Sequence, residues 1–313
     1  MNKPTSQQVG SGPKASVLVV GGVSIDLVTF SKRLPNPGES ILGDDFKIIL
    51  GGKGSNQAVA AALAGAHSTL VSSVGTDLFT DFAKDNLGDF GVDTEFVTQV
   101  EGPTGIAHIR VDSSSQNNIV VVPLANFKIT QSQVETALAN RPNAKVLLTQ
   151  LEIPWEVNRH AISLARAHGL IVVLDPAPAS NPEPTAWDLV NIVTPNESEA
   201  ESLTGIAVSD ETSASKAGAW FLDQGVENAV ITMGGSGVVL VNREGSKWFK
   251  APKVDAVDTT AAGDAFAGYL GALLAEGRSL EDAIEVAVKA ASISVTKLGA
   301  SSSLPTRNQV DSF

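Results

Sequence analysis

Short runs of apolar, largely β-branched residues recur along the chain, and each ends at glycine or polar residues. The first, VLVV at 17–20, is followed by Gly-Gly, which is typical of a buried strand. Between these runs lie longer segments in which apolar residues return every three or four positions, which predicts helices. Alternating strands and helices predict a Rossmann-like α/β domain of three layers, α/β/α, with a mostly parallel sheet. The strand runs lie within 16–30, 68–75, 144–152, 170–179, 189–200 and 227–241, and the clearest helices within 57–66, 156–169, 213–225 and 279–299.

Two regions, about 26–50 and 102–124, break this rhythm. Apolar and polar residues alternate in them, as in GIAHIRV and NNIVVV. This pattern predicts antiparallel strands with one solvated face. Since neither region is long enough for a domain, we expect a small β-sheet lid over one edge of the main sheet. Residues 16–313 are then a single domain.

Residues 1–15, MNKPTSQQVGSGPKA, are polar and rich in turn formers, so we expect a disordered leader. They lack the apolar core of a secretory signal. Apolar runs elsewhere are too short to span a membrane.

Composition narrows the classes of function. The chain has 34 Asp and Glu against 22 Lys and Arg, a net charge of −12, which argues against nucleic acid or an anionic membrane as a partner. It has no cysteine, which excludes disulfides and thiolate metal sites and fits a cytoplasmic location. The four histidines lack metal-ligand spacing, and no G-x-S-x-G motif is present, so zinc and serine hydrolase chemistry are set aside.

The stretch DTTAAGDAFAG at 258–268 places an acid, Asp264, at the predicted start of a helix. Small residues there allow a ligand to approach the backbone N–H groups of the first turn, which attract anions. The stretch therefore predicts an anion-binding turn with a carboxylate beside it. The alternative is that Asp264 only caps the helix.

Three further motifs follow predicted strands, where ligands bind in open α/β sheets. GGKGSN at 51–56 is not a Walker A loop, but Lys53 and Asn56 could bind a hydroxylated ligand; a tight structural turn is the alternative. Asn196 and Glu199 are three residues apart and could hold hydrated Mg²⁺, although acids in a first turn also favour the helix dipole. ITMGGSG at 231–237 is either a hairpin turn or a site for phosphate.

Taken in chain order, the motifs resemble the ribokinase-like (PfkB) family of sugar kinases, over about residues 16–305. Both family signatures are present, the Gly-rich one near the N-terminus and D-T-x-x-A-G-D near the C-terminus. The matching stretches are GGKGSNQAVAAALAG, LTQLE, DPAPA, TPNESEAESLTG, ITMGGSG, AVDTTAAGDAFAG and SVTKLGASSSLP.

The resemblance implies transfer of the γ-phosphoryl group of ATP to the 5-hydroxyl of D-ribose. It implies that Asp264 is the general base and that the backbone amides of Ala261, Ala262, Gly263 and Asp264 form an anion hole. It also implies a homodimer formed through the lid. The remaining implied roles are sugar contacts by Ser24, Asp26, Gly52, Lys53, Asn56 and Glu152; nucleotide contacts by Asn196, Thr232, Gly234, Gly237 and Val288; Mg²⁺ placement by Glu199; and a K⁺ loop of Asp258, Thr260, Ser294, Lys297, Gly299 and Ser303.

The chain departs from the family pattern at four places, and these bear on the choice of sugar. Ser24 and Asp175 stand where Asn is frequent, and Val288 stands where a polar residue is frequent beside adenine. The family's G-A-N motif is replaced by Leu124, Ala125 and Asn126.

Three alternatives to ribose therefore stay open at this point. A nucleoside kinase would need an apolar or aromatic base pocket, and the chain has one Tyr and 11 Phe. A 2-keto-3-deoxygluconate kinase would need a cation near the sugar, which Lys32, Arg33, Lys47 or Arg110 could supply; fructose is the third alternative. A non-catalytic sugar sensor would be expected to lose Asp264, and here Asp264 is present.

Overall fold

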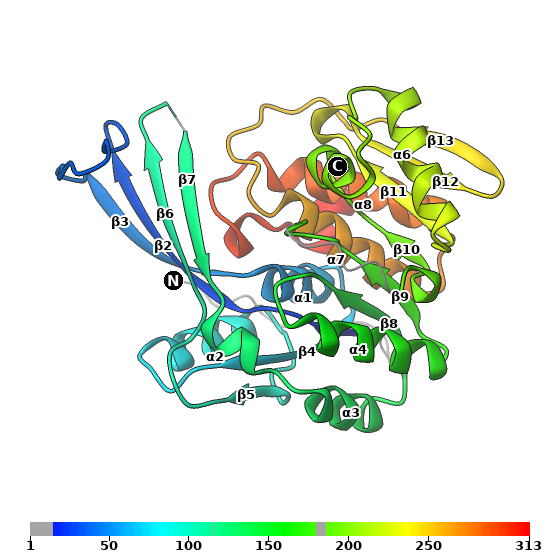
Figure 1. Ribbon diagram of the computed structural model, residues 1–313, viewed down its shortest axis with the longest axis horizontal. Coiled ribbons are helices and arrows are strands. Elements are labelled where there is room, and N and C mark those ends of the chain that lie inside the picture. The colour runs from blue at the N-terminus through cyan, green and yellow to red at the C-terminus, as the bar shows by residue number, and fades with distance from the viewer. Residues whose placement is uncertain (1–14, 115, 180–185) are drawn as a thin grey trace.

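The computed structural model describes residues 15–114, 116–179 and 186–313. Nine strands form the central sheet in the order β13-β12-β11-β10-β9-β8-β1-β4-β5 (Figure 1). Neighbours from β11 to β5 pair parallel, and β12 and β13 add an antiparallel edge. The strands are β1 (Ser16–Val20), β4 (His67–Val74), β5 (Val97–Gln99), β8 (Ala144–Thr149), β9 (Ile171–Leu174), β10 (Ile192–Val193), β11 (Asn228–Thr232), β12 (Val238–Asn242) and β13 (Gly245–Phe249).

Helices cover both faces of this sheet. On β1, Val17 and Val19 pack into one core, whereas Leu18 and Val20 pack into the other. This is why β1 is apolar throughout: each face of a central strand is buried. The first core is covered by α1 (Lys53–Leu63), α2 (Phe79–Asp89), α7 (Ala262–Ala275), α8 (Leu280–Ser294) and α9 (Arg307–Asp311), and the second by α3 (Gln131–Asn140), α4 (Trp155–Ala167), α5 (Glu197–Thr204) and α6 (Glu211–Asp223).

The expected α/β fold of three layers is therefore confirmed. Helix α8 ends at Ser294, five residues before the predicted boundary at 299, because the chain then turns toward Asp258. The leader expected at 1–15 lies outside the described residues except for Ala15. None of the helices in the described part of the chain has the length and apolar character needed to cross a membrane.

A second sheet of four strands stands beside the main one, in the order β3-β2-β6-β7 (Figure 1). It consists of β2 (Ser24–Ser31), β3 (Asp45–Gly51), β6 (Ile106–Asp112) and β7 (Asn117–Val122). Two antiparallel hairpins make up this lid, but they join through β2 and β6, which run parallel. The prediction of purely antiparallel strands was thus wrong at that junction, since a long connection lets two hairpins meet in either direction.

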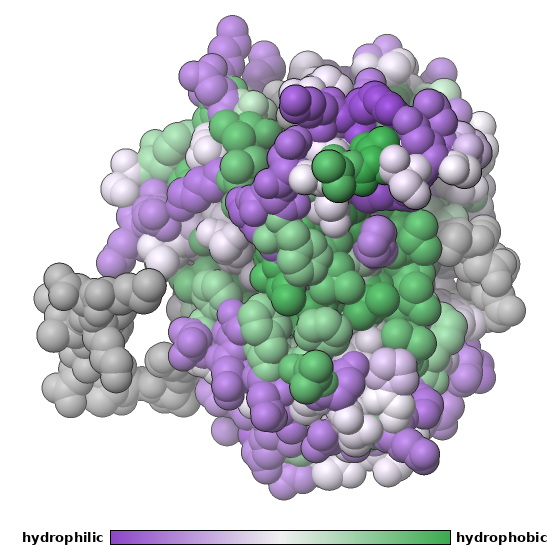
Figure 2. All heavy atoms as spheres, turned by 90° about the vertical axis from the view of Figure 1, so that its left-hand side faces the viewer, coloured by the Kyte–Doolittle hydropathy of each residue, from purple (hydrophilic) through white to green (hydrophobic). Residues whose placement is uncertain are grey.

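The lid leaves apolar side chains on the surface. All six residues of β7 are exposed, and Phe46 and Ile48 on β3 are exposed as well. Figure 2 looks at the side of the molecule on which the lid lies and shows a broad apolar area there. Exposed apolar area of this extent marks a surface for interaction.

Candidate active site

A cavity of about 1050 Å³ opens beyond the carboxyl ends of the parallel strands. It lies between α5, the η3 turn (Gly234–Ser236), and helices α7 and α8. Eleven residues predicted from the sequence line it: Lys53, Asn196, Glu199, Thr232, Gly234, Gly237, Ala261, Ala262, Gly263, Asp264 and Val288. The structure therefore brings together the proposed base, anion hole and nucleotide contacts, which come from four separate segments.

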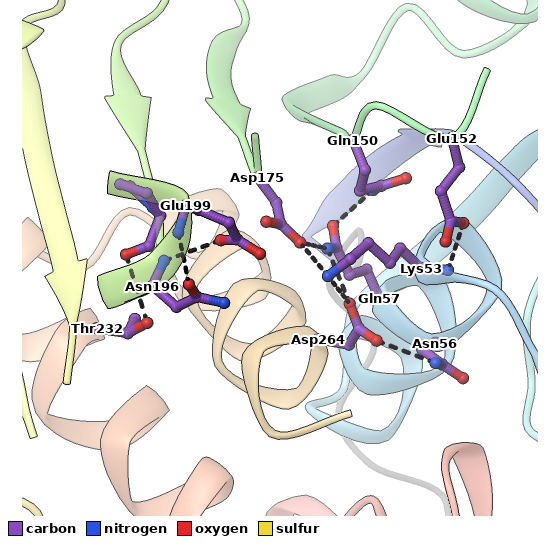
Figure 3. Close-up of polar contacts among 11 residues, drawn as sticks. Lys53, Asn56, Gln57, Gln150, Glu152, Asp175, Asn196, Glu199, Thr232 and Asp264 are labelled. Atoms are coloured by element: carbon purple, nitrogen blue, oxygen red, sulfur yellow. Dashed lines mark hydrogen bonds and ion pairs between the residues drawn. The ribbon is translucent and has the colours of Figure 1, made fainter. Parts of the chain in front are cut away.

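Asp264 lies in the first turn of α7 and is 5 % exposed. Asn56 Nδ2 donates to its Oδ2 at 3.0 Å, and Gln57 Nε2 donates to its Oδ1 at 3.1 Å (Figure 3). The N-cap position belongs to Ala261, and no side chain in the described part of the chain caps this helix. The capping alternative for Asp264 is therefore wrong, because its carboxylate points across to α1.

The turn before α7 leaves its backbone open to the cavity. Ala261 adopts a left-handed conformation with φ 60°, which is uncommon for a residue with a side chain. A Cβ built on Gly263 would meet no atom within 4 Å, although Gly263 lines the cavity. Packing therefore does not require glycine at 263, and its small size keeps the space above the helix start clear.

Helix α1 carries the charged partner of the acids. Gly52 precedes it with φ 92°, and a Cβ there would lie 2.6 Å from the backbone N of Ser24. Lys53 Nζ lies 3.2 Å from Asp175 Oδ2 and 3.8 Å from Asp264 Oδ1, and the Lys53 amide donates to Glu152 Oε2 at 2.8 Å (Figure 3). Burial lowers the pKa of the Lys53 ammonium, but the surrounding acids outweigh this effect and raise it. Lys53 therefore stays charged.

Apart from Lys53, which lines the cavity, the predicted sugar contacts lie around the start of β2, outside that lining. Ser24 Oγ donates to Asp26 Oδ1 at 2.9 Å. Burial raises the pKa of Asp26 to about 6 and that of Glu152 to about 7, and Lys53 opposes the second shift. Asn56 Oδ1 is buried and has no hydrogen-bond partner among the described residues. A buried acceptor of this kind, next to acids, fits a ligand that supplies hydroxyl groups.

Asn196 and Glu199 form a capping box at the start of α5. Asn196 Oδ1 accepts from the Glu199 amide, and Glu199 Oε2 accepts from the Asn196 amide, both at 2.9 Å. The amide oxygen of Asn196 is thus occupied by the helix. The box leaves Oε1 of Glu199 for other partners, and Glu199 lines the cavity.

The part of the cavity that carries the predicted nucleotide contacts is formed by glycines and an apolar wall. A Cβ on Gly237 would lie 2.0 Å from the carbonyl of Phe249, so only glycine fits there. Thr232 pairs with Asn196 in an isolated parallel β-bridge, and the backbone amide of Thr232 donates to the Pro195 carbonyl at 2.9 Å. Val288 of α8 is buried beside Ala291 and Val295 along the same cavity.

The six residues of the predicted K⁺ loop come from two segments, and Asp258 links them. Its Oδ1 accepts from the amide and the hydroxyl of Thr260 at 2.9 and 2.6 Å, and its Oδ2 accepts from the Gly299 amide at 2.9 Å. The carbonyl of Ser294 accepts from the Lys297 amide at 3.1 Å, and Ser303 lies in the η4 turn (Ser301–Ser303). Backbone carbonyls with one carboxylate are hard oxygen donors, which fit an alkali cation.

Sequence reasoning gave no role to Gln57 and Gln150, and it noted Asp175 and Asn126 only as parts of motifs. Gln57 contacts Asp264, Asp175 and Gln150. Asn126 binds both backbone groups of Val23 at 2.9 Å, just before β2, while Leu124 has φ 49°. Gln57 opens the segment 57–66 that was predicted as a helix, and no sequence pattern singled it out.

The fold and this site are those of an ATP-dependent sugar kinase, and comparisons with known proteins agree. The family model described as pfkB family carbohydrate kinase matches residues 14–307. The chain is 40 % identical over 301 residues to a ribokinase of Haemophilus influenzae, with 96 % of this chain and 98 % of that protein covered. It is 34 % identical over 299 residues to a deoxyribokinase of Salmonella typhi, with 95 % and 98 % covered.

A solved structure is similar as well. The ribokinase of Arabidopsis thaliana, complexed with ribose and ATP, is 30 % identical and superposes with a TM-score of 0.87 over 95 % of this chain and 97 % of that one. The chain therefore belongs to the pfkB family of carbohydrate kinases, as its motifs predicted.

Proposed function

We propose that this kinase transfers the γ-phosphoryl group of ATP to the 5-hydroxyl of D-ribose, with Asp264 as the general base. The observation that carries the proposal is the position of Asp264. It is buried where the cavity meets the residues around β2, and its carboxylate is held by two amide donors. The Arabidopsis relative, which binds ribose and ATP, supports the same pair of substrates here.

The reaction needs one proton transfer and one phosphoryl transfer. Asp264 takes the proton of the 5-hydroxyl, the sugar oxygen bonds to the γ-phosphorus, and the bond from that phosphorus to the β-phosphate oxygen breaks to release ADP. The amides of Ala261, Ala262, Gly263 and Asp264 donate to the oxygens of the transferring group. The Lys53 ammonium lies 3.8 Å from Asp264 Oδ1 and brings a positive charge to the reacting groups.

Residues around β2 would orient the sugar. Asp26 and Glu152 accept hydrogen bonds from its hydroxyls, and Lys53 donates. Ser24 supports Asp26 through its hydroxyl. The unpartnered Oδ1 of Asn56 accepts from a hydroxyl next to the one that reacts. Gly52 allows the sugar to approach the backbone. Residues 16–313 would act as one domain, with the lid from about 26–50 and 102–124 closing over the sugar.

Two cations fit residues of this site. Glu199 would hold Mg²⁺ through its waters with the oxygen that the capping box leaves, and Mg²⁺ neutralises charge on the phosphates. Asp258, Thr260, Ser294, Lys297, Gly299 and Ser303 would hold K⁺, which orders the loop that carries the anion-hole amides. Asn196, Thr232, Gly234, Gly237 and Val288 would bind the nucleotide.

The exposed apolar residues of the lid support a homodimer formed through this sheet. One observation, the 34 % identity to a deoxyribokinase, favours deoxyribose as a second candidate substrate. Ser24, which is shorter than the frequent Asn, bears on this choice because it stands beside Asp26.

The experiment that tests the function is ADP release with ATP, Mg²⁺ and K⁺ on ribose, deoxyribose, fructose, 2-keto-3-deoxygluconate and adenosine. We expect the highest kcat/KM on ribose. Asp264→Asn should lower kcat by about 10²- to 10⁴-fold while sugar binding persists. A variant within twofold of the parent would rule out Asp264 as the base, and preference for another sugar would reassign the pocket.

A further inference from the structure

Gln57 lies at the centre of a buried polar network that links four elements of the site. Its Nε2 donates to Asp264 Oδ1 at 3.1 Å and to Asp175 Oδ2 at 2.8 Å, and its Oε1 accepts from Gln150 Nε2 at 2.6 Å (Figure 3). Gln57 is 1 % exposed and Gln150 is 0 % exposed. Side chains from α1, α7 and the ends of β8 and β9 therefore meet at a single amide group.

The orientation of this amide is determined by its neighbours. Gln57 Nε2 donates to a carboxylate oxygen of each acid, so its NH₂ group faces Asp264 and Asp175. Its oxygen must then face Gln150, whose NH₂ group is turned toward it. Gln150 is itself held against the backbone, because a Cβ on Gly21 would lie 2.0 Å from Gln150 Oε1. The NH₂ group of Gln57 therefore donates to both acids, and its oxygen accepts from Gln150, which fixes the orientation of the amide.

The two oxygens of Asp264 have different surroundings as a result. Oδ1 accepts from Gln57 and lies 3.8 Å from the Lys53 ammonium, whereas Oδ2 accepts from Asn56 alone among the contacts that the described residues make. The Gln57 donor and the Lys53 ammonium therefore hold Oδ1 in place. Oδ2 lies beside the unpartnered Oδ1 of Asn56, where a hydroxyl group would be accepted.

We propose that Gln57 is a positioning residue for the general base: it holds Oδ1 of Asp264 so that Oδ2 faces the sugar hydroxyl and takes its proton. Gln150 fixes the orientation of the Gln57 amide by donating to its oxygen, and Asp175 accepts the second hydrogen of the same NH₂ group. This inference rests on the proposed role of Asp264 and does not depend on which sugar is phosphorylated.

The test is Gln57→Met, which keeps the length of the side chain and removes its two donors. We expect kcat to fall about 10- to 100-fold, because misplacement of a reacting group costs that much. The dissociation constant for the sugar, measured by calorimetry without ATP, should stay within about threefold. The acid limb of the pH profile of kcat should move up by about one pH unit, since a donor to the ionised base is lost.

The other charged groups that face Asp264 are unchanged in this variant. They are Lys53 on α1, Asp26 on β2, and Asp175 and Glu152 after β9 and β8. Thr80→Val is the matched control, because Thr80 is buried in α2 and loses one hydrogen bond, to the Gly75 carbonyl at 2.7 Å. It should lower the melting temperature and leave kcat and the pH profile as they are.

Gln150→Met is the second variant, and it keeps the inference open to refutation if Gln57→Met does not fold. It should lower kcat by less, about two- to tenfold. The amide of Gln57 would still donate to Asp264 and Asp175 but would lose the donor from Gln150 that fixes its orientation. The inference is overturned if a folded variant keeps kcat within twofold with an unmoved acid limb, or if only KM changes. Turnover that persists in Asp264→Asn would instead contradict the assignment of the base, so the two failures are distinguishable on any sugar that is turned over.

Discussion

Packing does not require glycine at position 263, so a substitution there can test the proposed anion hole without disturbing the fold. A Cβ on Gly263 would meet no protein atom, and its φ is outside the left-handed region. We predict that Gly263→Ala keeps or raises the melting temperature, because alanine favours a helix by up to ~1 kcal/mol over glycine. The added methyl group would enter the anion hole, so kcat should fall by about 10²-fold or more.

Gly268→Ala, one turn further along α7, is the matched control for that measurement. A Cβ there would lie 2.4 Å from Ala60 Cβ and 2.7 Å from the Gln57 carbonyl. Overpacking of this kind costs about 1–3 kcal/mol of the free energy of unfolding. Thermal unfolding and steady-state kinetics on both variants check the contrast, and a fully active Gly263→Ala enzyme would contradict the anion hole.

Asp26 makes the ligand-free protein sensitive to pH. Burial raises the pKa of Asp26 to about 6 in the folded chain, above its value of about 3.8 when unfolded. The folded state therefore binds more protons between these values, so the free energy of unfolding decreases as the pH rises through them. The contribution of Asp26 is fully present below pH ~4 and is lost above pH ~6.

Asp26→Asn should remove this decrease in the free energy of unfolding at high pH. We expect the variant to be more stable than the parent at pH 8 by about 1–3 kcal/mol, with little difference at pH 4, while its affinity for the sugar falls. Urea unfolding at the two pH values measures the first effect and calorimetry the second. Equal pH dependence in parent and variant would show that Asp26 ionises as freely when folded as when unfolded.

Local motifs predicted most candidate site residues, and long-range contacts decided the others. Asp264, Lys53 and Asn56 stand in Gly-rich turns after strands, where a sequence pattern marks a ligand. Gln57 differs from them because it reads as one more residue of an amphipathic helix. Its role depends on Gln150 and Asp264, 93 and 207 positions away, which no local pattern connects.

At the scale of elements, α5 uses one pair of residues for two purposes. Asn196 and Glu199 close the capping box, and Glu199 is also the proposed Mg²⁺ acid. Glutamine at the same position can complete such a box, since its side-chain oxygen accepts equally well. The helix and the metal site can therefore be separated by two substitutions at 199.

We predict that Glu199→Gln keeps the melting temperature of the parent but needs a higher Mg²⁺ concentration for half-maximal activity. Glu199→Ala should show the same Mg²⁺ defect and also lose about 1 kcal/mol of stability with the cap. Mg²⁺ titration of activity and thermal unfolding without Mg²⁺ check the two effects. Unchanged Mg²⁺ dependence in both variants would leave the capping box as the whole role of Glu199.

Periodicity predicted the strands of the main sheet that are apolar and buried. It missed β5 and β13, which lie outside the predicted runs and are mostly exposed. The lid was predicted less completely. The alternation within β2 and β6 marks them as strands, but their parallel pairing depends on how two distant hairpins meet. The end of α8 at Ser294 likewise depends on Asp258, whose amide donates to the Val295 carbonyl.

At the scale of the whole molecule, the strand register gives one face of the lid a row of adjacent aliphatic residues. Val28, Ile109 and Ile119 lie side by side there, Lys47 stands next to Val28 at the β3 edge, and Asp26 lies on the same face of β2. The opposite face includes Val120 and Ile48 but also His108 and Arg110. The uninterrupted row of Val28, Ile109 and Ile119 is the better core for an interface, because on the other face His108 separates Leu27 from Val120.

We predict that Ile119→Lys converts a dimer into a folded monomer, because Ile119 is 51 % exposed and a buried lysine in the interface would be unpaired. Val120→Lys, on the other face and 56 % exposed, is the matched control and should stay dimeric. Since Asp26 shares the face of Ile119, the monomer should also show a raised KM for the sugar with kcat less affected. Sedimentation velocity at micromolar concentration gives the oligomeric state, and a monomeric parent or a dimeric Ile119→Lys would remove this face from the interface.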